Sequence, residues 1–395
     1  MTLAHPVSGH PHVDVPLALV AGLGALLVFV AAVALPAGPD GPARPTRSLG
    51  VSWAGSLSRP QVAVRAVCVL LLGLAIAAGR AGVDDELENL APALVVGAGW
   101  PLLVLASVLT GPVWRWTDPF DGLARALTRR DPSPPPEPDH VWPAVVVALP
   151  VMWFVSAYPD PLDPRPLGTA LAVYTIVAVA GCVAAGRQRW LAAAEPLGAV
   201  LSWMALLPRR RLWHWEPPRG AEALLGVFAG GVLFGAVRRS ELWSPVNQSP
   251  DALTLSTVGL VGFCLVAALL LHLAGHVSVE GRPGVARAVV PALAGIVVAV
   301  ALERNVLLTS FQLLPGLLGD PFGLGWDLLG PAVRGLDPAP LGAVGLLVLQ
   351  LGVLLAGHAA GAVALAVRLR DNDRLPGAVA LLHLMAASVA AVAMH

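Results

Sequence analysis

Four histidines lie inside long apolar runs, and their type and spacing suggest chemistry. His272 and His276 are four residues apart, so on a helix they share one face. His358 and His383 each lie about ten residues from one short loop, which places both roughly 13 Å deep on adjacent helices, where they could face one another. Imidazole binds zinc, copper and haem iron, so these residues are candidate ligands for a transition metal or haem. The alternative is that each ring hydrogen-bonds a neighbouring helix.

Charged residues at the ends of apolar segments are candidates for substrate binding or gating. Glu195 precedes the short apolar segment 196–207, where it can also cap a helix. Two more, Glu303 and Arg304, follow a long apolar run, and an interfacial ion pair is the alternative there. The last two, Asp320 and Asp327, lie in the stretch GDPFGLGWDLLG, where they could bind a cation; capping of short helices is the alternative.

The sequence motifs of several protein classes are absent from this chain. There is no Walker A motif, no HExxH, no GxSxG and no CxxCH, which argues against an ATP-driven pump and against the commonest hydrolases. Three cysteines without a CxxC pair support neither a disulfide framework nor a zinc ribbon. The formal net charge is zero and no basic tract is present, so no nucleic-acid partner is expected.

The elements that would position these residues are transmembrane helices. The chain is 56% hydrophobic and only 13% charged, whereas soluble domains are about 25% charged. Because a helix crosses a bilayer with about 20 apolar residues, we expect an all-α bundle of about ten spans in a single domain, residues 1–395. The expected spans are 15–35, 61–79, 90–111, 141–157, 167–185, 221–237, 253–276, 287–302, 341–367 and 375–394. Segments 196–207 and 306–318 are too short to span and are expected to be interfacial or re-entrant half-helices.

The arginines predict an orientation. All 25 basic residues are arginine, and the expected loops alternate between arginine-rich and arginine-poor. By the positive-inside rule the rich loops are cytoplasmic, so both termini are expected outside the cytoplasm of a plasma-membrane protein. The lipid bilayer is the expected environment.

Several segments resemble a family of actinobacterial and haloarchaeal multi-pass membrane proteins that is often labelled "fenitrothion hydrolase". The matching segments are LAHPVSGH near the start, NLAPALVVGAGWPLLVLASVLTGPVWRWTDPFDGLARAL at 89–127, AEPLGAVLSWMALLP at 194–208, GDPFGLGWDLLG at 319–330 and GHAAGAVALA at 357–366. The resemblance implies a multi-pass membrane protein, and the label implies an organophosphate hydrolase. The chain has Glu303-Arg304-Asn305 where such proteins tend to have a histidine–aromatic pair.

Three functions follow from these observations. The leading hypothesis is a permease-like or membrane-embedded component that handles a small solute or metal. The first alternative is a membrane enzyme, either a redox protein with histidine-bound metal or haem or the hydrolase of the label. The second is a non-catalytic assembly subunit with a membrane partner subunit. The sequence leaves open whether the chain is an enzyme.

Overall fold

The fold is an all-α bundle, as predicted. The computed structural model describes residues 24–25, 58–128, 139–208, 211–277, 282–302, 306–329, 337, 340–366 and 371–393. In this part of the chain the regular elements are helices, and the only β-type pairing is an isolated bridge between His140 and Arg219. Apart from residues 24 and 25, the expected first span lies outside the described residues, as do Glu303 and Arg304.

Seven of the described helices are long and apolar enough to cross a membrane. Such runs become helical because lipid offers the backbone no hydrogen-bond partners, so every peptide group must be satisfied within its own helix. They are α2 (Arg59–Ala81), η1 with α3 (Pro92–Gly99 and Trp100–Thr110), α7 (Pro164–Ala185), α10 (Ala221–Arg239), α12 (Ala252–Val277), α13 (Arg282–Leu302) and α15 (Gly342–Ala366). The first half of the second span, η1, is a π-helix.

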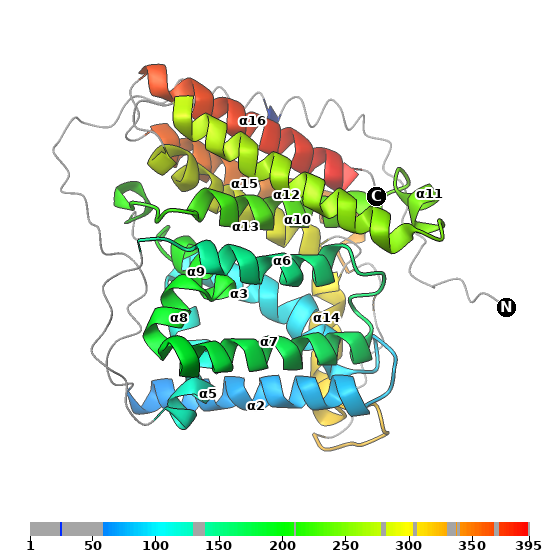
Figure 1. The fold of residues 1–395 in the computed structure, drawn as a ribbon. Helices are drawn as coiled ribbons and strands as arrows, with labels where there is room; N and C mark the ends of the chain where they lie inside the picture. The colour runs from blue at the N-terminus through cyan, green and yellow to red at the C-terminus, as the bar shows by residue number, and fades with distance from the viewer. Residues whose placement is uncertain are drawn as a thin grey trace.

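Shorter helices complete the bundle. Two are apolar, namely α6 (Trp142–Ser156) and α14 (Val306–Gly319), and a third, α16 (Asp371–Ala393), has a short apolar part at Arg374–Val389. The others are α4 (Trp114–Thr117), α5 (Pro119–Leu127), α8 (Arg187–Ala193), α9 (Pro196–Met204), the 3₁₀ turn η2 (Arg211–His214) and α11 (Ser244–Asn247). The long helices run side by side in Figure 1, whereas α14 lies across their direction.

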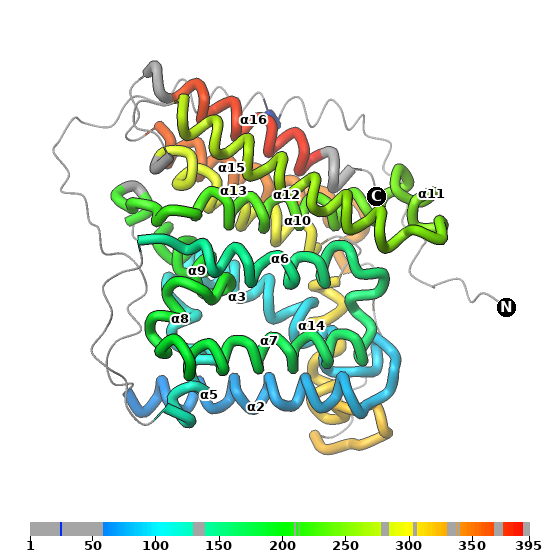
Figure 2. The backbone as a smooth tube through the Cα atoms, viewed as in Figure 1, coloured from blue at the N-terminus to red at the C-terminus, as the bar shows by residue number. Residues whose placement is uncertain are grey.

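Two helices form the centre of the bundle. In the most apolar 18-residue stretch of each helix, 89% of the residues of α13 and 78% of those of α10 are buried. The same share is 22% in α2, α7, α12 and α15. The pairs α13–α15 and α10–α12 make the most extensive contacts, and α2 packs on α7 at the opposite side (Figure 2). Small residues allow the close α13–α15 approach, since a Cβ on Gly295 would lie 2.7 Å from the backbone oxygen of Val353.

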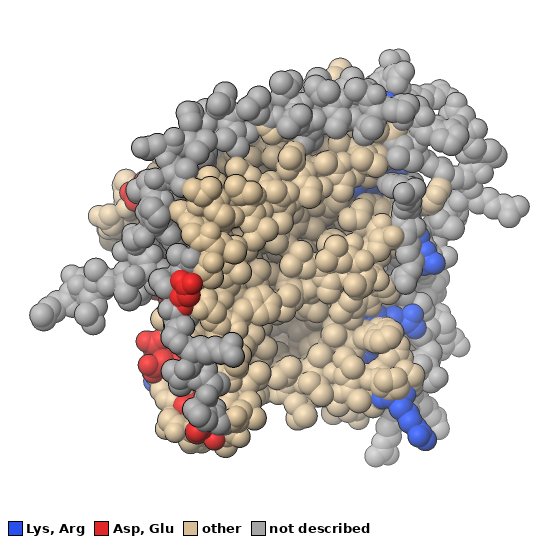
Figure 3. Space-filling model, turned by 180° about the vertical axis from the view of Figure 1, so that it is seen from behind, with Lys and Arg blue, Asp and Glu red and all other residues tan. Residues whose placement is uncertain are grey.

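The surface has the polarity of a membrane protein. Figure 3 shows a broad apolar face, with arginines gathered at one end and acidic side chains at the other. Many large apolar side chains of the long helices are exposed, for example Leu70, Ile176 and Val258 at 71%, 66% and 64%. Exposed side chains of this kind are stable in lipid and costly in water. The chain is therefore a multi-pass membrane protein.

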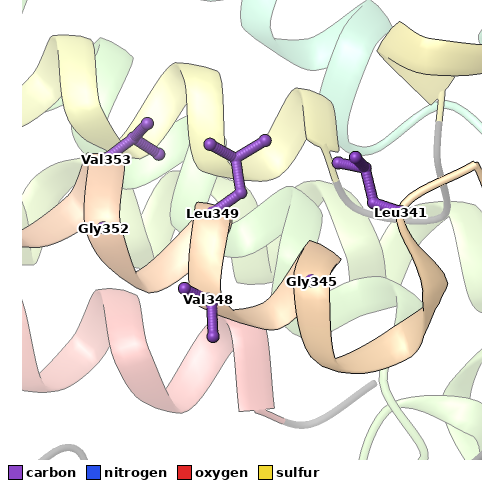
Figure 4. Close-up of a pocket in the computed structure, with 6 residues that line it drawn as sticks. All are labelled: Leu341, Gly345, Val348, Leu349, Gly352 and Val353. Carbon is purple, nitrogen blue, oxygen red and sulfur yellow. The ribbon is translucent and has the colours of Figure 1, made fainter.

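One shallow groove lies on this apolar surface. Its lining comes from the start of α15, namely Leu341, Gly345, Val348, Leu349, Gly352 and Val353 (Figure 4). None of these side chains can ionise or donate a hydrogen bond. The groove therefore offers apolar contact alone, which suits lipid tails or another helix.

Candidate functional site

The four candidate histidines do not form one site. His358 is fully buried, and its Nδ1–H donates to the backbone oxygen of Leu354 at 2.8 Å. His383 is exposed, and its Nδ1–H donates to the oxygen of Val379 at 2.7 Å. The expectation that these two rings face one another was therefore wrong. The sequence gives the position of a residue along its helix, but it leaves open which neighbouring helix that side chain contacts.

The other two histidines contact one another, and His272 lies beside a carboxylate that the sequence analysis did not single out. The rings of His272 and His276 pack edge to face with centroids 4.2 Å apart. Nδ1 of His272 lies 3.5 Å from Oε2 of Glu222, which is 9% exposed in the first turn of α10. Among the residues that the structure describes, however, no three His, Cys, Asp or Glu side chains lie close enough to hold a metal ion.

The two aspartates of the glycine-rich loop, Asp320 and Asp327, differ in their surroundings. Asp320 accepts hydrogen bonds from the backbone N–H groups of Leu324 and Gly325 at 3.0 and 2.7 Å. Asp327 is exposed in the same loop. Asp320 therefore caps backbone groups of its own loop and not of a helix, and the two carboxylates have different environments.

Glu195 is a predicted site residue whose carboxylate is buried and accepts several hydrogen bonds. Its side chain is the N-cap of α9 and accepts from the backbone N–H groups of Leu197, at 3.1 Å, and Gly198. The carboxylate thus satisfies two backbone donors at the helix N-terminus and complements the helix dipole there. The hydroxyl of Tyr174, on α7, donates a third hydrogen bond to it.

The short helix that Glu195 caps lies inside the bundle. It is nine residues long, and eight of them are buried, from Pro196 to Met204 with Leu197 the exception. Its neighbours are α3, α4, α6, α8 and α13. The segment is thus enclosed by protein, which favours the re-entrant interpretation over the interfacial one. A helix end at membrane depth is stable only where protein or a lined cavity satisfies it.

Aromatic rings cover the Glu195 carboxylate. The indole nitrogen of Trp114 lies beside Gly198 and Glu195, although it does not meet hydrogen-bond geometry. Phe120 contacts Tyr174 edge to face with ring centroids 5.2 Å apart, and it also contacts Trp114 at 6.2 Å. These rings exclude water from the carboxylate, which is 1% exposed.

A second buried acid caps a second short helix in the same region. Asp118 is the N-cap of α5, and its Oδ1 accepts from the backbone N–H groups of Phe120 and Asp121 at 2.8 and 3.1 Å. Phe120, Asp121 and Ala124 of this helix are buried, and α5 packs on α2 and α7.

Three arginines converge on Asp121. Its carboxylate accepts hydrogen bonds from Arg65 of α2, from Arg187 of α8 and, at 2.9 Å, from Arg125 of its own helix. The side chains of Asp121, Arg65 and Arg187 are 0%, 3% and 2% exposed. This ion-pair cluster joins α2, α5 and α8, and Arg65 also donates to the backbone oxygen of Arg115.

Burial and neighbouring charges shift the pKa values of the two capping acids, Asp118 and Glu195. Burial, followed by repulsion from Glu195 and Asp121, raises the pKa of Asp118 well above its usual value of 3.8. Burial also raises the pKa of Glu195, while the hydrogen bonds from Tyr174, Gly198 and Leu197 act in the opposite direction. Two carboxyl groups with raised pKa values in one buried region are suited to holding or moving a proton.

One sequence signal could have identified the second N-cap residue, Asp118. Asp118-Pro119 and Glu195-Pro196 share an acid followed by proline, which is typical of a helix N-cap and first helical position.

Comparison with protein-family models, curated proteins and solved structures found no match for the chain. The family resemblance of the sequence therefore stays a prediction.

Proposed function

We propose that the protein is a permease that moves a small polar solute across the membrane, with α9 and its Glu195 cap at the solute site. The observation that carries this proposal is the enclosed helix α9, whose N-terminus ends at a buried carboxylate among α3, α4, α6, α8 and α13. Many transporters bind their solute at such interrupted helices inside the bundle, where a half-helix N-terminus faces an anionic group.

The chemistry of the site favours a solute with an anionic group. In the described state, the Glu195 carboxylate occupies the N–H groups of Leu197 and Gly198. If the Glu195 side chain moves away, those donors and the positive end of the helix dipole become available to a carboxylate or phosphate of the solute. Glu195 would then act as an internal substitute for the solute's anionic group and keep the empty site satisfied.

The orientation follows from the charges. Figure 3 shows a basic end and an acidic end, and α5, α8 and α9 lie at the left of Figure 1, which is the basic end once the view is turned by 180°. By the positive-inside rule we assign this end to the cytoplasm of a plasma-membrane protein, with both termini on the other side. The solute site would then open toward the cytoplasm in one state of the transport cycle.

Reconstitution tests the proposal. Proteoliposomes would be incubated with radiolabelled lactate, succinate, glutamate or phosphate, and the uptake of each anion measured. We expect saturable uptake of at least one of these anions, reduced at least tenfold in Glu195→Ala and Glu195→Gln. Glu241→Ala, which changes an exposed acid at the start of the loop after α10, is the matched control and should keep the uptake. No uptake of any of these anions by the wild type would contradict the proposal.

A further inference from the structure

The hydrogen bonds of Asp118 are divided unequally between its two oxygens. Oδ1 accepts both backbone N–H groups of the cap, whereas Oδ2 has no hydrogen-bond partner. The residue is 0% exposed, so the second oxygen is closed to bulk solvent. An ionised oxygen in this position would be buried without a donor, which is far more costly than burying a neutral hydroxyl.

Glu195 shows the opposite pattern. Oε1 accepts from the N–H of Leu197 and the hydroxyl of Tyr174, and Oε2 accepts from the N–H of Gly198. Three donors and no acceptor face this carboxyl group, which favours its ionised form. The two caps therefore differ in the protonation state that their neighbours stabilise, although they occupy the same buried region.

The charged neighbours of Asp118 act in two directions. Arg65 and Arg187 donate hydrogen bonds to Asp121, one turn after Asp118, and at longer range both favour the ionised form of Asp118. Ionising Asp118 would place a further negative charge near Asp121 and Glu195. The titratable groups that face this region from the packed elements are Arg65 and Cys68 on α2, Tyr174 and Cys182 on α7, Arg187 on α8, Glu195 at α9, and Asp121 with Arg125 on α5.

We propose that Asp118 holds a proton at neutral pH beside the ionised carboxylate of Glu195, and that this proton is the ion coupled to solute movement. The coupling rests on the proposed permease function, whereas the location of the proton does not. The assignment makes the pair asymmetric, with one carboxyl that stores the proton and a second that holds the helix end. Such a pair is how two nearby acids divide acid and base roles.

Infrared spectroscopy of the reconstituted protein tests whether the proton is on Asp118. A protonated carboxyl group gives a C=O stretching band that an ionised carboxylate lacks, and solvent-exposed acids are ionised at neutral pH. We expect this band in the wild type at neutral pH and its loss in Asp118→Asn. In Glu195→Gln the band should remain but titrate at lower pH, because one repelling charge is gone. Asp320→Asn, which changes a loop cap with both oxygens bonded, should leave it unchanged.

Three results would overturn the assignment. These are no such band in the wild type, a band that survives Asp118→Asn, or a band that Glu195→Gln abolishes at every pH. Asparagine keeps a capping oxygen and copies the neutral form, so Asp118→Asn should also give a monodisperse, folded protein. A variant that fails to fold would therefore count against the proposal as well.

A flux measurement separates this inference from the permease proposal. Proteoliposomes loaded with the pH dye pyranine would be exposed to the same four anions. Solute-driven proton entry in the wild type, lost in Asp118→Asn, supports the coupling. Anion uptake without proton entry would refute the coupling and leave the permease standing. An assigned Asp118 band with no uptake of any of the four anions would keep the proton site and remove the permease.

Discussion

Replacing Asp121 by alanine should destabilise the protein more than any other single change to an acidic side chain at the site. The substitution leaves Arg65 and Arg187 buried, at 3% and 2% exposed, without the carboxylate that both contact. Removing one partner of a buried ion pair costs about 3–5 kcal/mol, and two guanidinium groups are affected here. Arg125 is 28% exposed and can turn to water, so it adds little.

The expected change in melting temperature follows from the chain length. At about 2.1 cal/mol/K per residue, the 395-residue chain has an unfolding entropy of about 0.8 kcal/mol/K. A loss of about 3–5 kcal/mol therefore lowers Tm by about 4–6 °C. Intrinsic fluorescence of the 12 tryptophans, recorded during heating in detergent, measures this shift.

Asp84→Ala is the matched control. Asp84 pairs with Arg165 at 3.6 Å, but these side chains are 47% and 63% exposed, so the loss should stay below about 1 kcal/mol. The double variant Arg65→Met with Asp121→Ala should recover part of the loss, since it removes one uncompensated charge. If Asp121→Ala melts within error of Asp84→Ala, the buried arginines are compensated by other groups and the reasoning fails.

Three further predictions concern packing and pH. Gly357→Ala should cost about 1–3 kcal/mol, because its Cβ would lie 2.7 Å from a backbone oxygen of α13, whereas Gly352→Ala on the same helix meets nothing within 4 Å and should be neutral in a thermal melt. His358→Ala should cost about 1–3 kcal/mol and the exposed His383→Ala less than about 0.5; equal Tm losses would contradict the burial assigned to the two rings. Because burial raises the pKa of Asp118 above 3.8, stability should fall as pH rises above that value toward its folded pKa; a Tm series from about pH 5 to about pH 8 should show this fall in the wild type and a flatter profile in Asp118→Asn.

The candidate site was only partly accessible from the sequence. Glu195 stood out because an acid directly precedes an apolar segment too short to span. Arg65 did not, because an arginine near the end of a span is normally assigned to the interface, yet it is 3% exposed. Tyr174 lies in an apolar run without any local mark of its bond to Glu195. Such partners come from different helices, so nothing in the local pattern of either residue records them.

The sequence by itself determined that the chain is an all-α membrane protein, because long apolar runs can satisfy their backbone in lipid only as helices. It also determined where most of those helices lie and that Glu195 caps a short one. Only the tertiary structure decided that α9 lies enclosed in the bundle, that Asp118 shares its region, and that His358 is buried while His383 is exposed. The reason is that periodicity gives position along a helix, whereas helix rotation and neighbours are set by packing among helices that are all apolar.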